Sequence, residues 1–262
     1  MDDATYAIRK HTSYENFEAE CPYCGYWNIF NRASDLKDFV PIDFRRVYCL
    51  NGNCTKEFNI NGDHVNAVYE MLVYDCHKLK QDKRYAYCIL NLAQAYETFF
   101  SQYLRVELLF KPFARDGEDN LYQLNELAQQ LYDYTKKYAF AQIRDIFLNR
   151  AVLCQKVNSL EDATLIIKQL KPQKKRPLPN APSDIIIAEL SDKHLSTLLR
   201  AVKHSKIAEL RNQVVHKYAY RPKLEEVEDA IEETRKTLFP LGAHLDIHID
   251  EINWYIEKFG HP

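Results

Sequence analysis

Tyr85 to Phe110 have the sequence YAYCILNLAQAYETFFSQYLRVELLF, which is apolar on nearly every face of a helix. Such a helix is buried on most of its sides, so this one predicts the centre of a helical domain. Glu97 lies in the middle of the stretch, and its helical neighbours carry no positive charge. Because a buried carboxylate without a partner is costly, we expect Glu97 to meet a cation from another element, and Arg211 is the candidate.

The character of the sequence changes near residue 62. Phe17 to about Asn61 is rich in turns and β-prone residues, whereas almost everything after Asp63 has helical periodicity. We therefore predict a mainly α chain with a small β module over residues 1–62 and a helical domain over residues 63–262. Further helices are expected at Leu121–Tyr134, Lys137–Val157 and Leu160–Leu170, from a cap at Ser191 to about Tyr218, from Pro222 to Leu238, and from Leu241 to Phe259.

Length and charge limit the classes of function. A chain of 262 residues can bury a real core in two units. Its 35 basic and 37 acidic residues nearly balance, so any contact with RNA must come from a local patch. The N-terminus lacks the basic and apolar regions of a signal peptide, and no stretch reaches the roughly 18 apolar residues of a membrane span. We expect a soluble cytoplasmic protein with no membrane contact.

Four of the seven cysteines form two close pairs, Cys21-Pro-Tyr-Cys24 and Cys49-Leu-Asn-Gly-Asn-Cys54. In an intracellular chain this spacing predicts four thiolates around one zinc ion, each pair closing a tight turn as in a zinc ribbon. Four protein ligands leave no open position for water, so the zinc is expected to be structural. Cys76, Cys88 and Cys154 are expected to be buried apolar thiols.

The aromatic residues of this module allow two interpretations. In the first, they bind nucleic acid by stacking, with help from nearby cations. In the second, they form the small core of the module. The residues concerned are Tyr23, Tyr26, Trp27 and Phe44, with the cations Arg45, Arg46 and Lys56.

A second stretch, RNQVVHKY from Arg211 to Tyr218, places an arginine, an amide, an imidazole and a phenol near the expected end of a helix. Arginine holds a phosphate through paired hydrogen bonds and histidine exchanges protons near neutral pH, so the pair suits metal-independent cleavage of RNA. Asn212 and His216 are four residues apart and therefore adjacent on a helix, and the long side chain of Arg211 can reach the same phosphate.

The faces of this helix predict a dimer. On one continuous helix, the core side carries Leu195, Leu199, Leu210 and Val214, and the motif shares the other side with His204, Ala208 and Val215. A face that mixes small, apolar and catalytic residues suits packing against a second copy of the helix across a two-fold axis. We therefore expect a homodimer with a composite active site.

The stretch also resembles the motif of the HEPN superfamily, in which Arg and His are separated by four to six residues and a polar residue commonly follows the Arg. The resemblance covers the helix around Glu97 and the motif helix, roughly half of the chain. It implies a helical bundle and an RNase in which the RNA 2′-hydroxyl attacks its own phosphate and leaves a 2′,3′-cyclic phosphate. His216 exchanges the proton, Arg211 stabilises the phosphorane, Asn212 orients His216 or the phosphate, and Glu97 holds Arg211.

The His-x-Tyr ending looks like the variant carried by HepT-type toxins. This likeness implies a toxin or an antiviral defence effector, with Tyr218 adenylylated by a partner nucleotidyltransferase antitoxin. Those toxins are shorter than this chain and lack the cysteine module. The alternatives for Tyr218 are stacking on a base and packing into the core.

A basic loop gives a further candidate contact with RNA. Lys171 to Pro182 contains four prolines, so it is not helical, and Lys174, Lys175 and Arg176 within it can grip an RNA backbone. The alternative is a solvated loop without a ligand. The competing function for the whole chain is a non-catalytic HEPN and zinc-ribbon module that binds RNA, a nucleotide or a partner protein.

Overall fold

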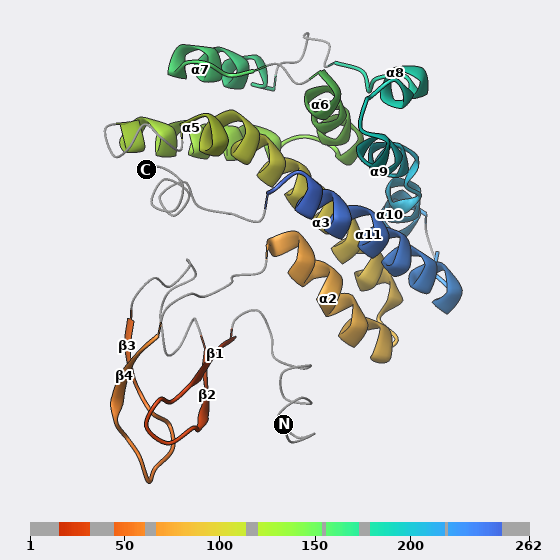
Figure 1. The fold of residues 1–262 in the computed structure, drawn as a ribbon. Coiled ribbons are helices and arrows are strands. Elements are labelled where there is room, and N and C mark those ends of the chain that lie inside the picture. The colour runs from red at the N-terminus through yellow and green to blue at the C-terminus, as the bar shows by residue number, and fades with distance from the viewer. Residues whose placement is uncertain are drawn as a thin grey trace. The chain divides into compact units, whose positions relative to one another are not determined.

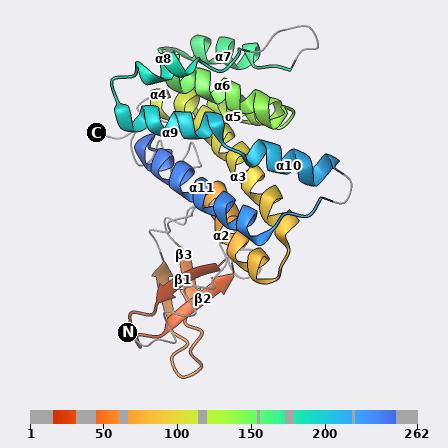
Figure 2. The same ribbon diagram turned by 90° about the vertical axis from the view of Figure 1, so that its right-hand side faces the viewer.

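The computed structural model describes residues 16–31, 45–60, 67–113, 120–153, 156–172, 179–217 and 220–247. The chain divides into two compact units, Met1–Asn66 and Ala67–Pro262. The first holds β-hairpins and the second holds helices, as Figures 1 and 2 show. The prediction of a mainly α chain with a small N-terminal β module is confirmed.

The first unit contains two antiparallel hairpins. β1 (Asn16–Glu20) pairs with β2 (Trp27–Asn31), and β3 (Arg45–Tyr48) pairs with β4 (Glu57–Ile60). The connection in each hairpin carries one pair of cysteines. The two cysteine pairs are therefore presented by equivalent turns.

A small core joins the two hairpins. Its buried side chains are Cys21, Phe30, Val47, Cys49, Phe58 and Ile60. Asn28 is buried as well, and its Nδ2 donates to the carbonyl oxygens of Ala19 at 3.2 Å and Tyr26 at 3.0 Å. Its Oδ1 accepts from the Leu50 N–H of the other hairpin at 2.6 Å, so one amide fixes the two turns together.

The aromatic rings near the cysteines are not part of this core. Tyr23, Tyr26 and Trp27 are 58%, 46% and 37% exposed. The interpretation of these three rings as the core of the module is therefore wrong. Phe44 lies outside the described residues.

The helical unit is built around one buried helix. The described helices are α2 (Val68–Gln81), α3 (Tyr85–Arg105), the π-helix η2 (Val106–Phe110), α4 (Lys111–Phe113), α5 (Leu121–Thr135), α6 (Phe140–Leu153), α7 (Leu160–Gln169), α8 (Asp184–Ala188), α9 (Lys193–His204), α10 (Ile207–His216) and α11 (Leu224–His244). α3 packs against α2, α6, α10 and α11. The predicted central helix is confirmed.

Aromatic side chains of α3 fill the core of this unit. Phe100 stacks on Phe147 of α6 with ring centroids 4.8 Å apart, and Tyr103 meets the same ring edge-on, also at 4.8 Å. Full burial of one such side chain stabilises the fold by about 1.5–3 kcal/mol. Cys76 and Cys88, one on each of α2 and α3, are fully buried in the same core, as expected. Cys154 lies outside the described residues.

The expected continuous helix from Ser191 to Tyr218 is wrong. Asp192 caps α9, because its Oδ1 accepts from the Leu195 N–H at 2.9 Å, and α9 ends at His204. At this end, Lys203 Nζ and His204 Nε2 both bind the carboxylate of Asp184, at 2.7 and 2.8 Å. The next residue is extended, with φ −56° and ψ 133°, and α10 begins after the break. His204 and the motif therefore lie on different helices and share no face.

The expected boundary between Leu238 and Leu241 is also wrong, because α11 continues through Pro240. Proline removes one backbone hydrogen bond from a helix. Thr237, Leu238, Leu241 and Gly242 are buried on both sides of it, so packing outweighs the lost bond. The helix expected to reach Phe259 falls mainly outside the described residues.

Candidate functional site

The Arg211 to His216 segment forms the last turns of α10, which packs against α3. Ile207 is buried at the start of α10, and Leu210 and Val214 are partly buried against the same core. These apolar residues hold α10 on the domain. Of the motif residues, Arg211 is half-buried, and Asn212 and His216 are exposed to solvent.

Arg211 lies beside Glu97 of α3. Burial raises the pKa of the Glu97 carboxyl group, because it disfavours the charged form, and the positive charge of Arg211 opposes this shift. No salt bridge joins the two side chains, both of which lie in the described part of the chain. The half-buried guanidinium acts on Glu97 through space, and its Nη1 donates to Asn212 Oδ1 at 3.5 Å.

Asn212 and His216 are exposed one turn apart on α10. The His216 side chain has no hydrogen-bond partner among the residues that the structure describes. Val215 beside it is 49% exposed. An imidazole that is open to solvent can exchange a proton with a bound molecule without first leaving a protein partner.

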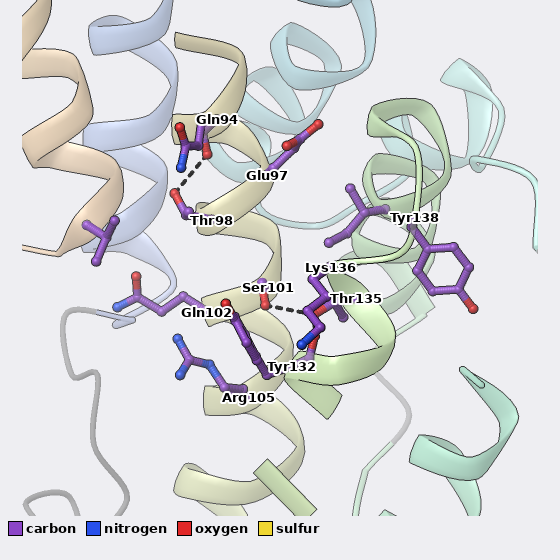
Figure 3. Close-up of a pocket in the computed structure, with 12 residues that line it drawn as sticks. Gln94, Glu97, Thr98, Ser101, Gln102, Arg105, Tyr132, Thr135, Lys136 and Tyr138 are labelled. Atoms are coloured by element: carbon purple, nitrogen blue, oxygen red, sulfur yellow. Dashed lines mark hydrogen bonds between the residues drawn. The ribbon is translucent and has the colours of Figure 1, made fainter. Parts of the chain in front are cut away.

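Glu97 also lines a cleft of about 410 Å³ (Figure 3). The residues around it come from α2, α3, α5, α6 and the connection from α5 to α6. They are Val68, Gln94, Glu97, Thr98, Ser101, Gln102, Arg105, Tyr132, Thr135, Lys136, Tyr138 and Ile143. Ser101 Oγ and Thr135 Oγ1 are hydrogen-bonded at 3.0 Å and join the two walls. Glu97 therefore takes part in both the motif and the cleft.

Sequence reasoning missed Arg105, Tyr132 and Lys136 as site residues. A signal for one wall was present, because Glu97, Ser101 and Arg105 recur every four residues and form a polar stripe on a helix whose other faces are mostly apolar. The opposite wall comes from the end of α5 and the turn after it, and it has no local sequence signal.

The four paired cysteines form a second candidate site. The ligand atoms of Cys21, Cys24, Cys49 and Cys54 lie within 4.8 Å of one another, an arrangement that is compatible with a metal ion. The Sγ atoms of Cys21 and Cys54 are 3.9 Å apart, and those of Cys24 and Cys49 are 3.7 Å apart. Asn51 Nδ2 donates to the Cys24 sulfur at 3.8 Å. The predicted cluster is confirmed, while the identity of its ion stays a prediction.

The thiols of this cluster differ in acidity. Burial raises the pKa of Cys21, but hydrogen bonds from the backbone of Tyr23 and Cys24 outweigh it and lower the value to about 7. Burial raises the pKa of Cys49 to about 11. The cluster is thus expected to lose its first proton at Cys21.

Four predicted functional residues fall outside the described part of the chain. They are Lys174, Lys175, Arg176 and Tyr218. Their roles in RNA binding and regulation stay predictions. None of the helices in the described ranges is long and apolar enough to cross a membrane.

Comparison of the chain with protein-family models, with curated proteins and with solved structures gives no match in any of the three. The interpretation of the site therefore rests on its own residues and their geometry.

Proposed function

We propose that the helical unit is a metal-independent endoribonuclease of HEPN type, with Arg211, Asn212 and His216 at its active site. One observation carries this proposal. The charge of Arg211 reaches the partly desolvated carboxyl group of Glu97, its guanidinium binds the amide of Asn212, and the exposed imidazole of His216 follows one turn after Asn212 on α10. A guanidinium and a solvent-accessible imidazole on the same short helix supply the charge stabilisation and the proton exchange that this reaction needs.

In the proposed reaction, the RNA 2′-hydroxyl attacks the adjacent phosphorus atom and the bond to the 5′-oxygen breaks. His216 exchanges the proton, while Arg211 stabilises the negative charge that develops on the phosphorane oxygens. Asn212 orients the phosphate or the imidazole. Glu97 acts on Arg211 through its charge, as a positioning residue. The products are a 2′,3′-cyclic phosphate and a 5′-hydroxyl.

A second copy of the chain is proposed to complete the active site. The exposed Val215 supports this arrangement, because it places an apolar side chain beside His216 on the surface of α10. Packing of two such helices across a two-fold axis would cover both valines and bring two motifs together. A role as a toxin or defence effector, under an antitoxin or nucleotidyltransferase partner, is part of the same proposal.

The ion of the cysteine cluster is proposed to be a structural zinc. A tetrahedron with Zn–S bonds of about 2.3 Å has edges of about 3.8 Å. The two sulfur separations of 3.9 and 3.7 Å match these edges, and all four sulfur atoms lie within 4.8 Å of one another, which supports a tetrahedral ion of this size. Four thiolates leave no position for a substrate, so zinc would stabilise the two hairpins without taking part in RNA cleavage.

Cleavage of RNA by purified variants tests the nuclease proposal. The full chain is incubated with total RNA and with tRNA in buffer without added divalent metal, and new ends are mapped chemically. We expect cleavage with cyclic phosphate ends, reduced about 10²- to 10⁴-fold by His216→Ala and by about 10² or more by Arg211→Ala.

His204→Ala is the matched control. This exposed imidazole binds Asp184 at the end of α9 and lies outside the motif, so its loss should leave the rate unchanged. Undiminished cleavage by His216→Ala would refute the assigned chemistry. No cleavage by the wild-type protein on any RNA would refute the nuclease.

A non-catalytic binding module is the second candidate function. It is favoured by exposed rings that flank the cysteine ligands: Tyr23, Tyr26, Trp27 and Tyr48, the last of which is 64% exposed. Lys56 Nζ lies 4.8 Å from the centre of the Tyr23 ring, so a cation accompanies them. This candidate predicts binding of RNA, a nucleotide or a protein without turnover.

A further inference from the structure

The cleft beside Glu97 has an unusual wall, because its polar residues belong to the most buried helix of the domain. Glu97, Ser101 and Arg105 are four residues apart and lie along one face of α3. With a rise of 1.5 Å per residue, the polar stripe extends about 12 Å from the carboxylate to the guanidinium. The other faces of α3 pack against apolar neighbours, so packing alone does not require this stripe.

The facing wall adds a cation and an aromatic ring. Tyr132 is 48% exposed near the end of α5, and the Lys136 side chain is likewise 48% exposed. Lys136 Nζ lies 5.1 Å from the centre of the Tyr132 ring and binds Asp133 Oδ1 at 2.5 Å. An exposed pair of this kind contributes little to stability, so Lys136 can exchange its partner for another anion.

The charges of the cleft are arranged along its length. Glu97, whose carboxyl group feels the charge of Arg211, and Arg105 lie two turns of helix apart on α3, and both line the cleft. Lys136 and Tyr132 belong to the wall opposite this polar stripe (Figure 3). Cations, hydroxyl groups and an exposed ring in one cleft fit a strand that carries phosphates and unpaired bases.

We propose that this cleft binds the single-stranded RNA that flanks the scissile phosphate, with Arg105 and Lys136 on backbone phosphates and Tyr132 stacked on a base. The proposal rests on the proposed function for the reaction at the motif. An unpaired strand is required, because only an unpaired base offers its face to a tyrosine ring. The cleft therefore directs the enzyme to loops and single strands.

RNA binding by the full chain in a His216→Ala background tests this assignment without cleavage. Affinity for a labelled single-stranded oligonucleotide is measured by fluorescence anisotropy over a range of salt concentrations. Lys136→Ala should weaken binding to all sequences and reduce the number of released counterions by about one. Tyr132→Ala should weaken binding about tenfold or more through lost stacking.

Two neighbouring residues provide matched controls. Lys137 follows Lys136 in the same turn, and Tyr122 is 77% exposed on the same helix as Tyr132, but neither lines the cleft. Lys137→Ala and Tyr122→Ala should change the affinity less than twofold. Equal effects of cleft and control variants would overturn the assignment, and so would equally tight binding of double-stranded RNA.

The outcomes separate this inference from the nuclease itself. RNA cleavage by the wild-type protein with an unchanged KM in Lys136→Ala and Tyr132→Ala would refute the cleft and leave the nuclease intact. Binding that depends on these two residues, without any cleavage, would support the cleft and refute the nuclease. If adenosine monophosphate competes fully and longer RNA binds no more tightly, the proposal of an RNA strand is refuted and the cleft binds a small ligand instead.

Discussion

Gly242 of α11 is buried at a point where an added methyl group would collide with Tyr69 of α2. A Cβ atom at this position would overlap the Tyr69 hydroxyl oxygen and would lie 3.2 Å from Tyr69 Cζ and 3.6 Å from Phe99 Cε2. The tyrosine cannot swing away, because it is fully buried and its ring lies edge-on to Phe99 with centroids 5.0 Å apart. We therefore expect Gly242→Ala to destabilise the helical unit.

The magnitude follows from two opposing effects. Overpacking of a well-packed core lowers the free energy of unfolding by about 1–3 kcal/mol. Alanine recovers up to about 1 kcal/mol, because it is a better helix former than glycine. The expected net loss for Gly242→Ala is about 1 kcal/mol. Removing the hydroxyl group with Tyr69→Phe relieves the overlap, so the same substitution should be less harmful in that background, with a coupling of about 0.5–3 kcal/mol.

Urea unfolding followed by helical circular dichroism measures this effect, since the described helices all belong to the second unit. Gly52→Ala is the control, because nothing lies within 4 Å of a Cβ atom added there. It should leave the helical transition unchanged. A Gly242→Ala protein at least as stable as wild type would refute the assigned packing of α2 against α11. The same conclusion would follow if Gly242→Ala lowered the free energy of unfolding by as much in the Tyr69→Phe background as in the wild type.

Two further perturbations probe the candidate sites. Folding raises the pKa of Glu97 above its ordinary value of 4.5, so the free energy of unfolding falls as pH rises through the interval between the unfolded and folded pKa values. Glu97→Gln should therefore raise the urea midpoint at pH 7 and give no gain below the unfolded pKa. The same variant should reduce RNA cleavage. A lower midpoint at pH 7 would contradict the burial assigned to this carboxylate. Removal of the metal from the cluster of Cys21, Cys24, Cys49 and Cys54 by a chelator should abolish the near-ultraviolet circular dichroism of Trp27 and its neighbouring tyrosines and leave the helical signal intact. Elemental analysis should find one zinc per chain beforehand, and loss of the helical signal with the metal would show that the two units do not fold independently.

The cysteine cluster and the central helix are the features that local sequence predicts best. Paired cysteines at short spacing must close turns, and Tyr85 to Phe110 offers too little polar surface to be anything but buried. The position of the rings around the cluster was not predictable in the same way. Trp27 and Phe30 are aromatic residues of the same strand, yet Trp27 is 37% exposed and Phe30 is buried, and their residue types alone do not say which face of β2 points inward.

The break before the motif helix is one that helical periodicity does not reveal. The segment His204-Ser205-Lys206 includes no proline or glycine, so the helical periodicity of the sequence predicts one continuous helix across it. At the break, Ser205 Oγ accepts from the Ile207 N–H at 3.3 Å, and Asp184, about twenty residues upstream, binds both Lys203 and His204 at the end of α9. Pro240 shows the opposite case, in which a strong local signal for a helix end is overridden by the burial of Leu238 and Leu241.

Glu97 belongs to the part of the candidate site that the sequence predicts, the interaction with Arg211, and to the part that it does not predict, the cleft. Its place in an apolar helix predicted a cation partner, and Arg211 is a neighbour that opposes the effect of burial on its pKa. The same carboxylate also lines a cleft whose second wall no local pattern revealed. A residue that served packing alone would be better replaced by an apolar side chain, because burial disfavours its charge. The presence of a carboxylate on α3 that both lines the cleft and feels the charge of Arg211 on α10 favours a single functional site made of motif and cleft.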